Sequence, residues 1–295
     1  MTGTKWTRKT LRELAKQLST KRHPVSHETV RRLLSQIEYS LRSNRKHLSR
    51  TQNPARDRQM RYIARRRRAF IKAGNPAISV DAKKKESVGN FKNPGRTWRS
   101  APLEVLATDF PSDALGKAIP YGIYDSARNH GFVVVGTSHE TAQFAVAAIR
   151  RWWVRVGQVA YPHAKQLLIQ ADAGGANSSR SWLWKLALQD FADEFGLSIT
   201  VTHYPTSASK WNLVEHRLFS FITLNWAGQP LISYETMLKF IRTTTTENGL
   251  CVVAYLDTRS YATKLKASRE QKAAIKLIRH RILPQWNYTI EPRRE

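Results

Sequence analysis

Two short apolar runs of this chain each end in an aspartate, and this repeated pattern limits the folds open to it. The first run covers residues 77–81 and the second covers residues 167–172. Apolar runs of this length are typical of buried strands. A third acid, Glu215, lies one turn into a predicted helix that starts near Asn212. The chain therefore places Asp81, Asp172 and Glu215 at defined points of its predicted core elements.

The strong positive charge of the chain indicates which kind of substrate these acids would act on. A formal net charge of +27 and a sequence pI of about 10.7 indicate nucleic acid or an anionic membrane surface as partner. Two hard divalent cations take oxygen ligands and can stabilise the attacking and leaving oxygens of a phosphoryl transfer. Carboxylates in such a basic chain therefore suggest phosphodiester chemistry on a polyanion.

Membrane-spanning, exported and disulfide- or zinc-stabilised proteins fit the sequence less well. No stretch approaches the roughly 20 apolar residues of a membrane span, and the first residues have no apolar signal core. Cys251 is the single cysteine, which excludes an internal disulfide and a cysteine zinc site and fits a reducing compartment. We therefore expect a cytoplasmic protein, and its basic charge fits association with the nucleoid.

The order of the expected elements predicts the fold class. In chain order we expect a strand over 77–81, a hairpin over 120–136, a helix from 139 or 140 to 156, a strand over 167–172, a helix over 179–195, a strand over 197–203 and a helix over 212–224. This is the order of an α/β, ribonuclease-H-like domain, a mixed sheet flanked by helices. The C-terminal extension is expected to add a helix over 233–242, a strand over 250–255, a basic helix over 268–281 and a strand over 285–290.

The first quarter of the chain carries most of the excess charge, +17 in residues 1–76 against +10 in the rest. Residues 7–18 form one amphipathic helical pattern, and residues 27–37, capped by Ser26, form a second. The second is expected to bury Val30, Leu33, Leu34 and Ile37 and to present to DNA His27, Arg31, Arg32 and Gln36. This predicts an all-α helix-turn-helix DNA-binding domain over residues 1–50. An ordinary helical hairpin is the alternative.

Residues 51–76 are predicted to be a basic linker helix before a catalytic domain over 77–295. Residues 56–72 of this helix contain four adjacent arginines, Arg65, Arg66, Arg67 and Arg68. Because these charges repel one another, the segment is expected to lie along phosphates; a solvated helix is the alternative.

The predicted chemistry assigns roles around the three acids. Asp81 and Asp172 would bridge two Mg²⁺ (or Mn²⁺) ions, and Glu215 would complete one ligand shell. Expected DNA contacts beside them are Lys83, Lys84, Asn177, Lys210, Trp211 and Asn212. Asn212 could instead bond a carboxylate, since it precedes Glu215 by three residues. Asn177 could instead orient the site, and the lysine run could be a solvated strand edge. Asp109 and Asp125 compete with Asp81 as ligands. Most tryptophans at helix positions are expected to be core residues, namely Trp152, Trp153, Trp182 and Trp184.

Several segments together resemble a known family. They are VDAKKKESVGNFKNPG, PYGIYD, LLIQADAGGANSSR, SASKWNLVEHRLFSFITLNW and LISYETMLKFIRTTTTENGL. They resemble bacterial insertion-sequence DDE transposases of the ISAzo type, distant relatives of mariner-like elements. The resemblance runs from about residue 80 to the C-terminus and more loosely through the helix-turn-helix. It implies cut-and-paste DNA transposition with two divalent metals, normally magnesium, and carries the three family acids onto Asp81, Asp172 and Glu215.

The chain departs from the family pattern in two places. Members usually have more chain before this helix-turn-helix, including another DNA-binding module. Thr108 stands where a histidine is usual, in the segment Ala107-Thr108-Asp109-Phe110.

The expected partner is double-stranded DNA at element ends and targets, bound by a homodimer, with no membrane and no small-molecule substrate. The alternatives are a DNA-binding regulator with an inactive catalytic scaffold and a structure-specific nuclease or resolvase of the same fold.

Overall fold

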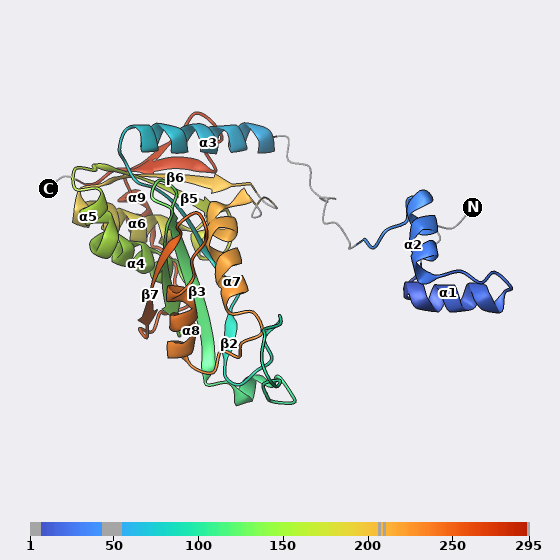
Figure 1. The fold of residues 1–295 in the computed structure, drawn as a ribbon. Helices are drawn as coiled ribbons and strands as arrows, with labels where there is room; N and C mark the ends of the chain where they lie inside the picture. Colours follow the sequence, from blue (N-terminus) through green and yellow to red (C-terminus); the bar gives the residue numbers. More distant parts are fainter. Residues whose placement is uncertain (1–6, 43–54, 206–207, 209–210, 294–295) are drawn as a thin grey trace. The chain divides into compact units, whose positions relative to one another are not determined.

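The computed structural model describes residues 7–42, 55–205, 208 and 211–293, and the chain divides into two compact units, 1–51 and 52–295. The first unit contains α1 (Leu11–Thr20) and α2 (His27–Gln36), shown in blue in Figure 1. Thr10 and Glu13 form a capping box, with Glu13 N donating to Thr10 Oγ1 at 3.2 Å and Thr10 N donating to Glu13 Oε2 at 2.7 Å. This cap starts α1 at residue 11 rather than at residue 7, and Ser26 caps α2 as predicted.

The predicted buried stripe of α2 is only partly buried. Val30 is buried, but the exposed fraction is 45% for Leu33 and 62% for Ile37. Two short helices cannot enclose all of their apolar side chains. Those side chains therefore border an open hollow of about 250 Å³ between the helices, lined by Leu14, Gln17, Leu18, Lys21, Val30, Leu33, Leu34 and Ile37.

The predicted separate linker over 51–76 is corrected by the packing of α3 (Arg56–Lys72). This helix belongs to the second unit and lies against its sheet (Figure 1). Ile63 packs with Tyr204, and Phe70 packs with Ala77 and Leu168. The apolar side chains between the basic ones are what attach the helix, so it is part of the second unit.

The second unit is built on one mixed sheet. Its strands are β1 (Ala77–Ala82), β2 (Glu86–Val88), β3 (Gly116–Asp125), β4 (His130–Gly136), β5 (Gln166–Asp172), β6 (Ser198–Tyr204), β7 (Cys251–Asp257), β8 (Leu277–Arg279) and β9 (Asn287–Ile290). The order is β7-β4-β3-β1-β5-β6-β9-β8, with β2 pairing to β3 outside this path. Strands β1, β3 and β4 are antiparallel neighbours, while β1, β5 and β6 run parallel. This is the ribonuclease-H-like arrangement that the sequence predicted.

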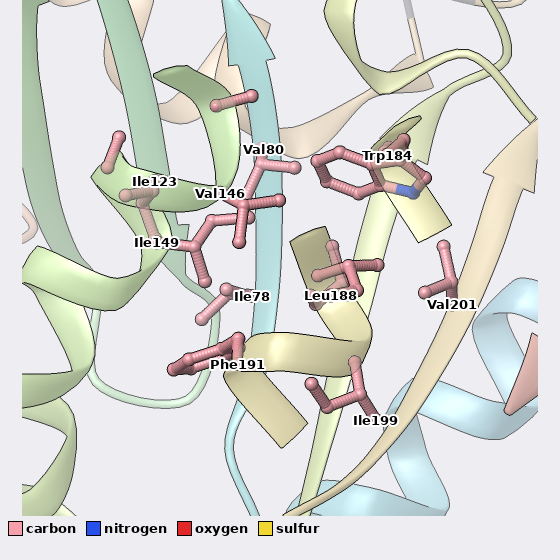
Figure 2. Close-up of a cluster of buried hydrophobic side chains, with 14 of the residues drawn as sticks. Ile78, Val80, Ile123, Val146, Ile149, Trp184, Leu188, Phe191, Ile199 and Val201 are labelled. Carbon is pink, nitrogen blue, oxygen red and sulfur yellow. The ribbon is translucent and has the colours of Figure 1, made fainter. Parts of the chain in front are cut away.

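Helices cover both faces of the sheet. The remaining elements are η1 (Pro111–Asp113), α4 (Ala142–Trp152), the π-helical η2 (Trp153–Gly157), α5 (Gln158–Ala160), η3 (Gly175–Asn177), α6 (Trp182–Phe195), the π-helical η5 (Glu215–Phe219), α7 (Ser220–Asn225), α8 (Tyr234–Arg242) and α9 (Arg269–Ala273). Figure 2 shows the core on the α4 and α6 side, where Ile78 and Val80 of β1 meet Ile149, Trp184 and Leu188. A second core on the other face contains Val214, Phe219 and residues of α8. No helix among the described residues has the length and apolar character to cross a membrane.

The prediction of a basic helix over 268–281 is wrong. The helix α9 ends at Ala273, and the chain then forms β8, in which Leu277 pairs with Ile290 of β9. The hydrogen-bond partners of β8 lie in β9, 9 to 13 residues further along the chain, and β9 in turn pairs with β6, where Thr289 lies opposite Thr200. Pairing within the sheet therefore overrides the helical pattern of this segment.

Candidate active site

Asp81 and Asp172 lie side by side on two central strands. Strands β1 and β5 run parallel, and Val80 pairs with Ala171. The next residues of the two strands are therefore Asp81 and Asp172. Val80 and Ala171 point into the core under α4 and α6, and successive strand residues face opposite sides of a sheet. Both carboxylates consequently project from the opposite face, at the carboxyl ends of their strands.

Asn212 joins the two aspartates. Its side-chain Nδ2 lies 3.1 Å from Asp172 Oδ1 and 3.4 Å from Asp81 Oδ2, and its side chain is fully buried. Ser79 donates its hydroxyl to Asn212 Oδ1, and Val214 N donates to Ser79 Oγ at 3.1 Å. The predicted DNA contact by Asn212 is therefore wrong, because no surface of this side chain is left for a phosphate. The alternative role, bonding the carboxylates, is the one that the structure shows.

Glu215 enters the site from a π-helical turn, η5, that begins at this residue. Single π-turns inside helices are frequent at functional sites. The turn rests on Gly122 of β3, the residue paired with Asp81. A Cβ at Gly122 would lie 2.5 Å from Phe219 Cε1 and 3.0 Å from Val214 Cγ2. The absent side chain therefore lets the Glu215 turn approach the strand next to Asp81.

The three carboxyl groups repel one another in a partly buried setting. Burial, and then the charge of Asp172, raises the pKa of Asp81 to about 8. Burial raises the pKa of Asp172, while the hydrogen bond from Asn212 lowers it. Burial and then the charge of Asp172 raise the pKa of Glu215, against the lowering effect of Lys83. All three pKa values are raised, so the site would be stabilised by positive charge.

The donor set fits a hard divalent cation. Mg²⁺ is commonly held by one or two carboxylates together with waters and substrate phosphates, and Asp81 with Asp172 supplies such a pair. Among the described residues, no three His, Cys, Asp or Glu side chains lie close enough to hold one ion. Glu215 therefore acts on the pair through its charge in this arrangement, as the direction of its pKa shift indicates.

The backbone of Asp172 is held by a chain of buried hydrogen bonds that the sequence did not reveal. His203 Nδ1 lies 3.0 Å from Asp172 O, and His203 Nε2 lies 3.0 Å from Tyr288 Oη. Trp184 Nε1 donates to the same hydroxyl at 3.0 Å. The carbonyl oxygen can only accept, so Nδ1 carries the ring hydrogen and Nε2 accepts from Tyr288. Burial lowers the pKa of His203 to about 4, which keeps the ring neutral for these bonds.

Glu140 is a further acid near the site that sequence reasoning missed. Its charge contributes to the raised pKa of Asp81, after burial and the charge of Asp172. Its Oε2 lies 3.8 Å from Lys85 Nζ, and its Oε1 would lie 3.2 Å from a Cβ at Gly175, in the loop after Asp172. In the sequence Glu140 only marked a possible helix start; its place beside Gly175 depends on the β1–β5 arrangement.

The residues predicted to contact DNA beside the acids differ in their burial and in their contacts within the protein. Lys83 is held within the unit by Glu86 at 2.6 Å and lies 4.7 Å from the centre of the Trp226 ring. Asn177 is 1% exposed and accepts the Tyr121 hydroxyl at 2.7 Å, so the prediction that it touches DNA is wrong for the same reason as for Asn212. Lys84 and Trp211 are exposed and stay predicted contacts. Lys210 lies outside the described residues.

The residues of α2 and α3 that were predicted to contact DNA also differ in exposure. His27, Arg31, Arg32 and Gln36 are all exposed on α2, and Arg31 pairs with Glu28 one turn earlier. On α3, Arg65 and Arg68 are exposed, whereas Arg66 and Arg67 are half-buried. One side of α3 faces the protein, so the four arginines differ in exposure, and their contacts with DNA stay a prediction.

The two aspartates considered as alternatives to Asp81, namely Asp125 and Asp109, have different environments. Asp125 is buried and accepts the Tyr161 hydroxyl at 2.8 Å and Ala127 N at 3.1 Å, so it shapes the β3–β4 turn. Asp109 is exposed. The tryptophans expected in the core are there: Trp152, Trp153 and Trp184 are buried, and Trp182 packs against the same core.

Comparison with known families decides where the chain belongs. The model of the family described as "Rhodopirellula transposase DDE domain" matches residues 1–292. The chain belongs to this family. The family resemblance drawn from the sequence motifs is confirmed, and the match extends it through the N-terminal helices.

Solved structures of Mos1 transposase are similar to the chain. "Mos1 transposase paired-end complex with left transposon end" is 14% identical, with a TM-score of 0.46, over 79% of this chain and 65% of that chain. "Crystal structure of the Mos1 mariner paired end complex with Mn" is 15% identical, with a TM-score of 0.47, over the same shares. The transposase family member described here thus spans 65% of the length of these Mos1 chains. No curated protein matches the chain.

Proposed function

We propose that this chain catalyses metal-dependent DNA strand cleavage and strand transfer at the ends of an insertion sequence. The observation that carries the proposal is the pairing of Asp81 and Asp172 through one buried amide, Asn212, at the carboxyl ends of adjacent parallel strands. A carboxylate pair that was only structural would not need to be brought together against its own repulsion. Membership of a transposase domain family supports the same reaction class.

Each acid has a distinct part in this proposal. Asp81 and Asp172 would hold two divalent ions, Mg²⁺ or Mn²⁺, which supply Lewis-acid stabilisation of the attacking and leaving oxygens. Glu215 would complete one ligand shell once substrate phosphates are present. Asn212 would keep the two aspartates in register, and the His203–Tyr288 pair would hold the Asp172 backbone.

The proposed substrate is double-stranded DNA. The charge of +27 favours a polyanion, and the exposed residues of α2 are suited to contact a major groove. Because an element has two ends, two copies of the chain are expected to act together on DNA. A chain of this charge is expected to associate with the bacterial nucleoid.

The test compares Asp172→Asn with Asp190→Asn on DNA that carries the ends of the element. Asp190 is exposed on α6, and its side chain lies 3.7 Å from Arg293, away from the carboxylate pair. With Mg²⁺ or Mn²⁺ at one salt concentration, we expect nicks at the ends from wild type and Asp190→Asn. Nicking should fall by several orders of magnitude in Asp172→Asn, which keeps the side-chain volume but loses the charge.

Other outcomes would assign another class. Specific binding of end DNA without nicking by wild type would identify a regulator. Nicking of branched DNA regardless of the element ends would identify a structure-specific nuclease or resolvase. Equal nicking by Asp172→Asn and wild type would overturn the site assignment itself.

A further inference from the structure

The eight cations of α3 separate into five exposed ones and three half-buried ones, Arg56, Arg66 and Arg67. Five of them are exposed and recur every three or four residues; we call them the α3 stripe, and they are Arg58, Arg61, Arg65, Arg68 and Lys72. At about 100° per residue they fall within about 80° of the helix circumference. The stripe therefore forms one continuous basic line rather than a ring of charge.

The opposite side of α3 is fixed to the protein. Gln59 Nε2 donates to Asn287 Oδ1 at 2.8 Å, and Asn287 Nδ2 donates back to Gln59 Oε1 at 2.7 Å. Gln59 Nε2 also donates to His203 O at 2.8 Å. Arg66 lies on this inner side, 5.5 Å from the centre of the Phe70 ring. The stripe is thus presented by a helix whose rotation about its own axis is set by buried side chains.

The stripe has no acidic partner within the described part of the chain. The ion pairs found there involve other cations, namely Arg31, Lys83, Lys85, Arg150, Arg259 and Arg293. Some exposed cations of the second unit are used in such pairs, for example Arg150 with Glu194, while others, such as Lys117 and Lys239, also have no ion pair among the described residues. The alignment of the five cations on one side of a fixed helix is what distinguishes the stripe. Five aligned cations that repel one another and form no ion pair with a described acid favour an external polyanion.

We propose that the α3 stripe is a docking surface for the sugar–phosphate backbone of double-stranded DNA, independent of base sequence. The proposal rests on the proposed function, because that function makes DNA the substrate. Fourteen residues of helix separate Arg58 from Lys72, or about 21 Å at 1.5 Å per residue. Along this length each strand of a duplex carries about six phosphates, so the five cations of the stripe would face a similar number of negative charges. Within the tetrad Arg65–Arg68, only the first and last residues belong to this surface.

The experiment measures the salt dependence of binding to a random-sequence duplex with the full-length chain. The stripe variant is Arg65→Gln/Arg68→Gln. The control is Lys117→Gln/Lys239→Gln, which removes the same charge from exposed positions of β3 and α8; α8 lies at the other end of the unit from α3 (Figure 1). Fluorescence anisotropy would give the binding constant over a series of salt concentrations, and thermal melting would check that each variant is folded.

Each lost phosphate contact lowers the slope of log K against log salt by about 0.9. We therefore expect the slope of the stripe variant to be less steep by about 2, with weaker binding, and the control to keep the wild-type slope. Equal slopes in the stripe variant and wild type would overturn the proposal. So would a stripe effect on duplex RNA that is absent on duplex DNA, because the surface would then serve another partner.

These results are separable from the nicking test. A changed slope in a chain that nicks no DNA would retain the docking surface and reject the proposed catalysis. An unchanged slope in a chain that nicks element ends would reject the docking surface alone.

Discussion

Asn212 Nδ2 lies 3.1 Å from Asp172 Oδ1, across a separation of 40 residues in the chain. The same nitrogen lies 3.4 Å from Asp81 Oδ2. One buried amide thus connects the two strand-end carboxylates and the turn that carries Glu215. Burial raises the pKa of Asp172 and the Asn212 hydrogen bond lowers it, so Asn212 favours the charged form that would bind a cation.

Replacing Asn212 by alanine should loosen the carboxylate pair. The Ser79 hydroxyl would lose its acceptor, which should lower the free energy of unfolding by about 1–3 kcal/mol. Groups that orient metal ligands typically contribute about 10-fold to 100-fold to activity, and we expect that loss in nicking of end DNA. Urea unfolding and single-turnover nicking would measure the two effects.

The control for this change is Asn225→Ala, which removes an exposed amide that donates to Phe240 O in α8. It should keep the nicking rate. A wild-type nicking rate in Asn212→Ala would show that the carboxylates keep their positions without the amide.

Divalent ions should stabilise the folded chain through the aspartate pair. A ligand that binds only the folded state adds about 2.7 kcal/mol at one hundred times its dissociation constant. We expect Mg²⁺ or Mn²⁺ to raise the melting temperature of wild type and of Asp190→Asn but to leave that of Asp172→Asn nearly unchanged. Calorimetry with EDTA as the reference would measure this, and an equal rise in all three proteins would place the ions elsewhere.

Adding a methyl group at Gly122 should separate β3 from the Glu215 turn. The new Cβ would lie 2.5 Å from Phe219, and overpacking of this kind costs about 1–3 kcal/mol. We expect Gly122→Ala to unfold at lower urea concentration and to nick DNA more slowly. Gly174→Ala is the matched control for stability, because no atom lies within 4 Å of its Cβ position; equal stability of the two variants would contradict this account of Gly122.

Lys185 should make stability depend on pH in the alkaline range. Its side chain is buried and donates to Ser179 O at 2.5 Å, and burial, then the charge of Arg279, lowers its pKa to about 8. The unfolded chain, with a lysine pKa near 10.4, therefore binds more protons between these two values. Stability from this group should rise with pH over that window and be constant below it.

Lys185→Met should lack this rise. Urea unfolding at pH 7.5 and 9.5 would compare the two proteins, so that other titrating groups cancel in the difference. Parallel changes in wild type and variant would show that Lys185 keeps its ordinary pKa in the folded chain.

The strands that carry the acids were predictable because their signal is local. An apolar run of five or six residues specifies β1 and β5 without reference to the rest of the chain. Ser26 marks the start of α2 because its side chain accepts from Thr29 N, and Gly196 ends α6 in a left-handed conformation that glycine adopts readily. The order of these strands and helices is compatible with few folds, so the fold class could be predicted from it. The segment 268–281 was mispredicted because β8 pairs with β9, and β9 is held in the sheet by β6, which lies far away in the sequence.

The sequence by itself determined the central strands and helices between residues 77 and 224, their order and which acids end the central strands, since hydrophobic periodicity and capping act between near neighbours. Only the tertiary structure decided that Asn212 and Asn177 are buried rather than presented to DNA, that His203 holds the Asp172 backbone, and which cations of α3 face outward. These facts depend on which face of each element packs against a distant partner. Burial and hydrogen bonding across tens to hundreds of residues set that choice, and no local pattern encodes it.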